Sequence, residues 1–223
     1  MLFEDVKTYN FGFLLAGLLL SMVLLPLISG LDLETTALLT ETAFLLTLLV
    51  GVWSLIGSVL WFRIGVALTV LTGLMTIGHA FWPIEWLSHA IALLTLLFLL
   101  VSSAIAFRSV FSTGVVDINR LFGAACIYLM LALIWALLYM LLDSYQSQSL
   151  TVAISDPFWE YLYFSIVTLT TLGYGDIAPV THAARVLAGF EAIVGQFYLT
   201  ILVAVLVGML SPSVVPVRIS GSA

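Results

Sequence analysis

Charged residues are scarce in this chain. Of its 223 residues, six are Lys or Arg and twelve are Asp or Glu, together 8% of the total, whereas 63% are hydrophobic. So few polar side chains cannot cover the surface of a water-soluble protein. The formal net charge of −6 also argues against a nucleic-acid-binding protein, which needs basic patches. The composition therefore indicates an integral membrane protein.

Cysteine is nearly absent as well. The single one, Cys126, excludes an intrachain disulfide framework and any CxxC metal site, and we expect it to be a small buried hydrophobic residue. The signatures GxSxG, HExxH and Walker A do not occur, so the sequence gives no sign of an enzyme. His79 and His89 flank Glu85, but their spacing is not that of metal ligands on one helix, which makes a metal site the less favoured interpretation.

Long apolar runs are what the chain does contain. A helix needs about 20 mostly apolar residues to cross the hydrocarbon core of a bilayer, and six segments meet this requirement. They are Phe11–Ser29, Ala37–Val59, Phe62–Ala80, Leu87–Phe107, Leu121–Leu142 and Ala184–Leu210. A seventh segment, Pro157–Thr170, has the length of a re-entrant helix, with Asp156 as its N-cap. We therefore expect an all-α membrane protein with six transmembrane helices and one helix that enters the membrane and returns.

Basic residues predict the orientation of these spans. Six spans place both ends of the chain on one side of the membrane, and Lys and Arg favour the cytoplasmic side. Only Arg185 falls opposite the two ends, and the other five basic residues fall with them: Lys7, Arg63, Arg108, Arg120 and Arg218. Both termini are therefore expected in the cytoplasm, and the opposite loops form an acidic mouth that attracts cations.

The stretch TLTTLGYGD, from Thr168 to Asp176, does not suit helix packing. Gly173 and Gly175 would each cost roughly 1 kcal/mol relative to alanine inside a helix. Irregular backbone at membrane depth is tolerated only inside protein or along a water-filled path. Glycine dihedrals allow an extended loop to keep its carbonyl oxygens on one side. Rings of such oxygens replace the water shell of a cation in potassium filters.

Thr171–Asp176, placed after a re-entrant helix and between two spans, resembles the selectivity filter of tetrameric potassium channels. The resemblance covers about Leu121–Leu210. It implies four identical chains around a central pore, bound K+ ions and no other cofactor. Backbone carbonyls of the first four filter residues, with the Thr171 hydroxyl, would form the ion sites. The filter residues so implied are Thr171, Leu172, Gly173, Tyr174 and Gly175.

This sequence departs from the family pattern at three positions beside the filter. Leu172 stands where valine or isoleucine is usual. Tyr163 and Phe164 stand where many relatives carry a tryptophan pair, so the resemblance does not imply a bracing hydrogen bond to Asp176. Tyr174 is expected to point away from the ions into the layer of pore helices. The residues expected to support the filter are Asp176, Tyr163, Thr168, Thr170 and Glu191.

The sixth span contains several residues for which we expect particular roles. A carboxylate inside a span is costly and is functional by default. We expect Glu191 to form hydrogen bonds behind the pore helix, to a threonine or Tyr163, with a response to pH as the alternative. Gly195 is either a hinge or a close-packing residue. Three apolar residues beyond it form either a hydrophobic gate or a packing face: Leu199, Val203 and Val207.

The expected organisation follows from these elements. It comprises a four-helix unit at 1–107, an interfacial linker at 108–120, a pore domain at 121–210 and a short cytoplasmic tail at 211–223. Within the pore domain lie the pore helix at 157–170, the filter at 171–176 and the inner helix at 184–210. Voltage sensors place arginines at every third position of their fourth helix, and Leu87–Phe107 has none.

The sequence therefore predicts a homotetrameric, potassium-selective channel without a conventional voltage sensor. Membrane lipid and potassium ions are its expected partners, nucleic acid is not, and the bacterial cell membrane is the expected location. Three alternatives stay open. They are a weakly selective cation channel, a secondary transporter with a re-entrant loop, and a non-conducting accessory subunit.

Overall fold

The computed structural model describes residues 10–28, 59–82, 84–111, 117–151 and 157–210. Within these ranges the chain is helical, and the one β-type contact is an isolated bridge between Leu150 and Pro179. The expected second span, 37–59, lies outside the described residues except for its last residue, and the expected tail at 211–223 lies wholly outside them.

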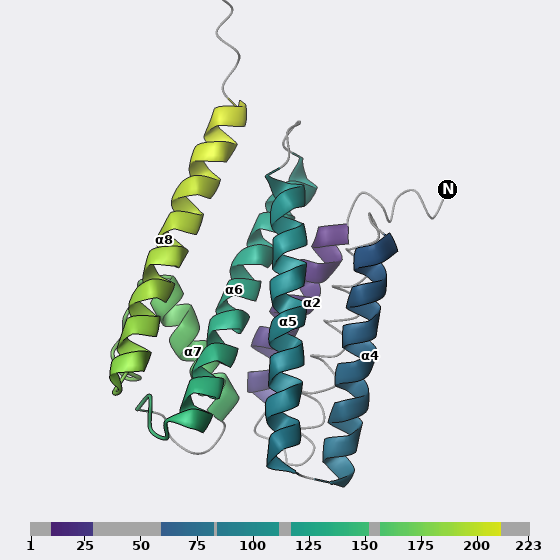
Figure 1. The fold of residues 1–223 in the computed structure, drawn as a ribbon. Helices are drawn as coiled ribbons and strands as arrows, with labels where there is room; N and C mark the ends of the chain where they lie inside the picture. Colours follow the sequence, from purple (N-terminus) through teal and green to yellow (C-terminus); the bar gives the residue numbers. More distant parts are fainter. Residues whose placement is uncertain (1–9, 29–58, 83, 112–116, 152–156, 211–223) are drawn as a thin grey trace, which may run out of the picture.

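The helices agree with the predicted segments to within three residues at each end (Figure 1). They are α2 (Asn10–Ile28), α4 (Val59–Phe81), α5 (Glu85–Val110), α6 (Ile118–Tyr145), α7 (Pro157–Leu169) and α8 (His182–Leu210). Among the described residues, three stretches are long and apolar enough to cross a membrane: Trp86–Val110, Ile118–Tyr145 and His182–Val205. The apolar stretches described in α2 and α4 are shorter, Phe11–Val23 and Arg63–His79. The structure is therefore that of an all-helical membrane protein.

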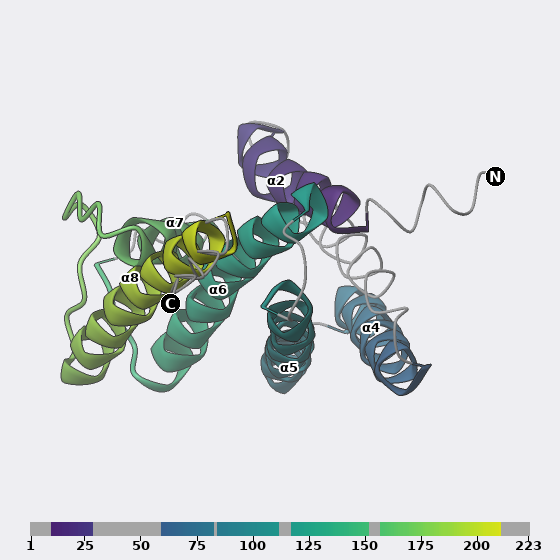
Figure 2. The same cartoon turned by 90° about the horizontal axis from the view of Figure 1, so that it is seen from above.

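Helix α6 is the centre of the packing. It contacts α2, α5, α7 and α8, whereas α4 packs against α5. Seen from above, α7 and α8 lie to one side of α6, and α4 and α5 lie to the other (Figure 2). Half of the most apolar window of α6 is buried, compared with 17% of that of α8. Helices α7 and α8 are therefore backed by α6, and α8 forms an outer face of the chain.

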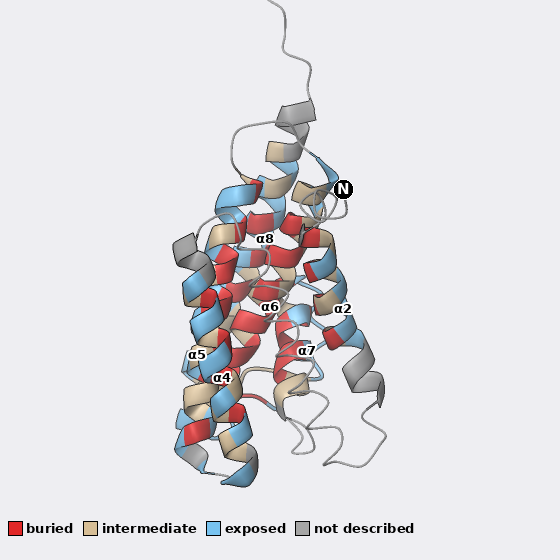
Figure 3. Cartoon of the chain, turned by 90° about the vertical axis from the view of Figure 1, so that its right-hand side faces the viewer, coloured by how far each residue is buried: buried red, intermediate tan, exposed pale blue. Residues whose placement is uncertain are grey.

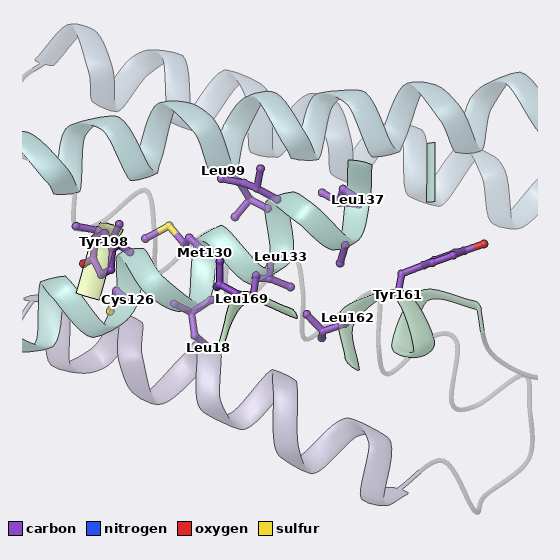
Figure 4. Close-up of a cluster of buried hydrophobic side chains, with 14 of the residues drawn as sticks. Leu18, Leu99, Cys126, Met130, Leu133, Leu137, Tyr161, Leu162, Leu169 and Tyr198 are labelled. Carbon is purple, nitrogen blue, oxygen red and sulfur yellow. The ribbon is translucent and has the colours of Figure 1, made fainter. Parts of the chain in front are cut away.

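The core runs along α6 and into α7 (Figure 3). Its buried side chains come from several helices, as Figure 4 shows for Leu18 of α2, Leu99 of α5, Met130 and Leu133 of α6, and Leu169 of α7. Apolar burial of this kind stabilises helix contacts in a membrane through close van der Waals packing. The short helix α7 is therefore anchored in the same core as the long helices.

A small residue allows α2, α5 and α6 to meet at one point. A Cβ atom on Gly123 would lie 2.7 Å from Cγ2 of Val110 and 3.1 Å from Cδ2 of Phe11. One turn further along α6, Cys126 is fully buried, as predicted, and its thiol donates to the carbonyl oxygen of Phe11 at 3.4 Å. The start of α2 is therefore fixed against the start of α6.

The two ends of the described chain lie toward the same end of α6. Phe11 reaches Gly123 and Cys126, and the Tyr198 hydroxyl of α8 donates to the carbonyl oxygen of Ala124 at 2.7 Å. Phe11 at the beginning of α2 and Tyr198 near the middle of α8 thus both contact the first turns of α6.

The connection between α5 and α6 is shorter than the predicted linker at 108–120. Helix α5 continues to Val110 and α6 begins at Ile118, so three residues at each end of the predicted linker belong to these helices. Asp117 caps α6, and its side chain accepts a hydrogen bond from the Arg120 backbone N–H at 2.8 Å. Residues 112–116 lie outside the described part.

Candidate functional site

The loop Thr171–Asp176 begins directly after α7 ends. The Leu172 N–H donates to the carbonyl oxygen of Val167 at 2.9 Å, and the Thr171 N–H donates to that of Thr168, also at 2.9 Å. This pair of hydrogen bonds is the Schellman arrangement, which requires a left-handed residue at its turn. Thr171 occupies that position with a φ of 57°. A β-branched residue rarely adopts this conformation, and the sequence did not predict it.

The loop then alternates in backbone handedness. Gly173 has a φ of 61° and Gly175 a φ of 81°, whereas Leu172 and Tyr174 do not have positive φ. The sign of φ therefore alternates from Thr171 to Gly175. Both glycines adopt the left-handed dihedrals for which the sequence analysis expected them.

The middle of the loop is uncovered by its own chain. A Cβ atom on Gly173 or Gly175 would meet no atom within 4 Å, so these glycines are not there to avoid a neighbour. Leu172 is 56% exposed and Tyr174 is 68% exposed. Most of the Tyr174 side chain is thus left uncovered by the described part of the chain, and its expected packing into a layer of pore helices stays a prediction.

The outer end of the loop is tied back to α7. The Tyr163 hydroxyl donates to Oδ2 of Asp176 at 2.7 Å. This hydrogen bond holds the pKa of the Asp176 carboxyl below its usual value. Tyr163 therefore provides a bracing hydrogen bond to Asp176, although this chain lacks the tryptophan pair that many relatives carry at this place. Of the other expected supports, Thr170 donates to the carbonyl oxygen of Ile166 at 2.7 Å, and Thr168 accepts from the Thr171 backbone.

The segment after the loop is fixed to the end of α6. The Val180 N–H donates to the carbonyl oxygen of Ser149 at 2.8 Å, and the Thr151 N–H donates to that of Ala178 at 3.0 Å. Asp143 accepts from both the backbone N–H and the hydroxyl of Ser149, each at 2.7 Å. Both ends of the loop are therefore anchored, while its middle stays open.

Glu191 lies fully buried behind α7, where three helices meet. Its Oε2 accepts from the Tyr139 hydroxyl of α6 at 2.6 Å, and its Oε1 lies 2.5 Å from the Ser165 hydroxyl of α7. The Ser165 oxygen is also 2.8 Å from the carbonyl oxygen of Ala132. The expectation of a bond behind the pore helix was right, but the expected partners, a threonine or Tyr163, were wrong. Ser165 instead faces α6 and α8, and Tyr163 bonds to Asp176.

Gly195 lies where α8 crosses the end of α7. A Cβ atom there would collide with the carbonyl oxygen of Leu169, which also accepts a hydrogen bond from the Tyr128 hydroxyl at 3.1 Å. Close packing therefore explains this glycine. Helix α8 is continuous through the position, from His182 to Leu210. Whether the helix also bends there stays a prediction.

The expected gate residues lie on the C-terminal half of α8. Leu199 is 37% exposed and Val203 is 58% exposed, so the described part of the chain leaves a portion of each side chain uncovered. The side chain of Val207 lies outside the described part. No group of three or more His, Cys, Asp or Glu side chains among the described residues is arranged to hold a metal ion.

Several contributors to the site were missed by sequence reasoning. Tyr128, Tyr139 and Tyr198 place hydroxyls inside the helix packing, and Tyr128 and Tyr198 also stack with ring centroids 5.7 Å apart. A tyrosine in the middle of a span is itself a signal, because its hydroxyl must find a partner there. The sequence offers the signal but not the partner.

The part of the chain that contains this loop is similar in sequence to known proteins. Residues 125–211, which include α7, the loop and α8, match a protein family described as ion channel. That part of the chain, less than half of its length, is therefore similar to ion channels, which are not enzymes. Over 55 residues the chain is 44% identical to a protein of Oryza sativa subsp. japonica named two pore potassium channel c. This similarity covers 25% of the chain and 11% of the rice protein. No solved structure matches the chain significantly.

Proposed function

We propose that this chain is one subunit of a homotetrameric, potassium-selective channel that conducts K+ passively through the loop Thr171–Asp176. The loop carries the proposal, because its φ alternates in sign through two left-handed glycines and a Cβ on either glycine would meet no described atom within 4 Å. Such a backbone can turn its carbonyl oxygens toward a cation. The ion channel match at residues 125–211 supports it, and so does the similarity to a protein named as a potassium channel.

Four copies complete the site. One chain supplies one loop, and a ring of oxygens around a dehydrated cation needs several. The uncovered side of α8 supports such an assembly, since many of its apolar residues are exposed in the single chain. They include Val186, Phe190, Ile193, Phe197 and Ile201. In the tetramer this face would meet the neighbouring subunits, and the exposed Tyr174 would meet a neighbour's pore helix.

The proposal includes an orientation and a gate. The start of α2 and the end of α8 lie toward the same end of α6, which suits two termini in the cytoplasm of a bacterial cell. Helix α8 then crosses the membrane from the acidic mouth inward. Leu199 and Val203 lie on its inner half, where a ring of apolar side chains closes a pore by dewetting.

Reversal potentials of the purified protein in planar bilayers test this function. With a K+ gradient and equal Na+ on both sides, the potential should follow the K+ gradient. Gly175→Ala should abolish the current, because a Cβ strains a φ of 81°. Gly78→Ala is the control, since its added Cβ would meet only Leu87 Cδ2 at 3.9 Å, an ordinary contact.

The same recordings separate the alternatives. Unitary currents with a potential insensitive to the K+ gradient would identify a weakly selective cation channel instead. Saturable flux without unitary currents would indicate a transporter. Complete absence of flux at varied pH, calcium and membrane tension would favour an accessory subunit.

A further inference from the structure

The inner end of the loop receives a hydrogen bond from α8. The Gln196 side chain places Nε2 3.1 Å from the hydroxyl oxygen of Thr171. Gln196 follows Gly195, the residue whose missing side chain lets α8 approach the carbonyl oxygen of Leu169. The close crossing of the two helices therefore brings the amide within reach of the loop.

Thr171 is an unusual residue to fix in this way. Its φ of 57° lies in the left-handed region, which β-branched residues seldom adopt. Backbone hydrogen bonds hold the N–H groups of Thr171 and Leu172 to α7, but they do not determine where the hydroxyl points. The amide of Gln196 acts on that side chain directly.

The chemistry of a hydroxyl explains what the amide does. A threonine oxygen has two lone pairs and one proton, and the proton rotates to suit its surroundings. When an amide N–H donates to that oxygen, one lone pair is used and the proton turns away from the donor. The proton and the second lone pair then share the two remaining directions, and a cation on the ion path favours the arrangement in which the lone pair faces it. Cations such as K+ bind oxygen lone pairs and are repelled by the hydroxyl proton.

We propose that Gln196 is a positioning residue for the innermost ion site, because its side-chain amide holds the Thr171 hydroxyl with its oxygen toward the ion path. This inference rests on the proposed function, in which Thr171 is the first filter residue that an ion meets from the cytoplasmic side. Gln196 acts through Thr171 and need not touch the ion itself.

The test measures block by Ba2+, a divalent cation of similar size to K+, applied from each side of the channel in turn. Gln196→Met keeps the length of the side chain and removes its donor. Cytoplasmic Ba2+ block should weaken by about three- to tenfold, as expected for the loss of one neutral hydrogen bond. External block should change little, because outer ion sites keep their geometry. A purely structural role would not produce this asymmetry.

Two further variants complete the design. Gln196→Asn keeps the amide but shortens the side chain by one methylene, so it should lose the reach and behave as Gln196→Met does. This variant also serves if Gln196→Met does not assemble. Thr69→Val is the control, since it also removes a polar group from a helix and the Thr69 hydroxyl donates to the Gly65 carbonyl of its own helix, α4, at 2.9 Å.

Wild-type cytoplasmic block in both Gln196 variants would overturn the inference, as would an equal change of block from both sides. Either result, obtained with K+-selective wild-type currents, leaves the proposed function intact. A wild-type protein that does not select K+ would instead remove the proposed function, which is a separate outcome.

Discussion

The Tyr163 hydroxyl and the Asp176 carboxylate are joined by a hydrogen bond of 2.7 Å that links α7 to the end of the loop Thr171–Asp176. Tyr163 lies in the middle of α7, and Asp176 is the last residue of the loop. A single phenol thus holds this end of the loop in place, although a Cβ on Gly173 or Gly175 would meet no described atom within 4 Å.

Removing this hydroxyl should loosen the filter. In Tyr163→Phe the loop loses its tie to α7, so K+ current should fall and selectivity for K+ over Na+ should decrease in reversal-potential measurements. Tyr145→Phe is the control, because Tyr145 is 87% exposed at the end of α6. Equal selectivity in the wild type and Tyr163→Phe would show that the bond is dispensable.

The same pair predicts tolerance to acid on the outer side. The pKa of Asp176 is lowered from 3.8, chiefly by the Tyr163 hydrogen bond, so the ionised form is the one stabilised. A lowered folded-state pKa gives stability that is present above 3.8 and is lost only as pH falls below it. Current should therefore stay constant as external pH falls from neutral toward this value. A midpoint clearly above it, absent in Asp176→Asn, would contradict this assignment.

Glu191 should act through its hydrogen bonds and not through its charge. In Glu191→Gln the amide oxygen accepts from Tyr139 and the amide nitrogen donates to Ser165, which then donates to the Ala132 carbonyl. Tetramer stability should be close to that of the wild type. Glu191→Leu leaves the buried Tyr139 hydroxyl unpaired and should cost about 1–3 kcal/mol, measured by thermal unfolding in detergent.

The Glu191→Gln variant also tests the alternative role of Glu191, a response to pH. If the carboxyl group titrates during gating, wild-type current should depend on cytoplasmic or external pH and Glu191→Gln should abolish that dependence. Currents of identical pH dependence in both proteins would favour the purely structural role.

Gly195→Ala distinguishes packing from bending. The added Cβ falls on the Leu169 carbonyl oxygen, so the end of α7 or the path of α8 must shift. Overpacking of this kind costs about 1–3 kcal/mol in unfolding measurements. Gly189→Ala is the control, since its Cβ would meet nothing within 4 Å in the chain. Unchanged stability with a reduced open probability would favour a hinge instead.

Voltage dependence should be shallow. Moving one charge through the field is worth about 2.3 kcal/mol per 100 mV, and steep gating needs several charges in each subunit. The one Arg or Lys of α5 is Arg108, which lies in its last turn. Macroscopic currents over a wide voltage range should yield a small effective gating charge that varies with the permeant ion. A large charge, independent of the ion, would require a sensor elsewhere.

Helix positions and the character of the loop were predictable from the sequence. Span length follows from bilayer thickness, and the ends of α7 follow from a proline at its start and the glycine-rich stretch at its close. Gly173 and Gly175 were assigned left-handed dihedrals because few other residues adopt them. These are local properties, and each depends on a residue and its near neighbours in the chain.

Only the tertiary structure decided which side chains of different helices contact one another. Each residue turns a helix face by about 100°, so a small change in rotation gives a side chain a different neighbour. Nearly every face of these helices is apolar, and hydropathy therefore does not say which one meets α7. For this reason the sequence identified Glu191 but not Tyr139 and Ser165, and Gly195 but not the Leu169 carbonyl. The left-handed Thr171 and its bond to Gln196 likewise arise where α7 and α8 cross, and packing alone fixes that crossing.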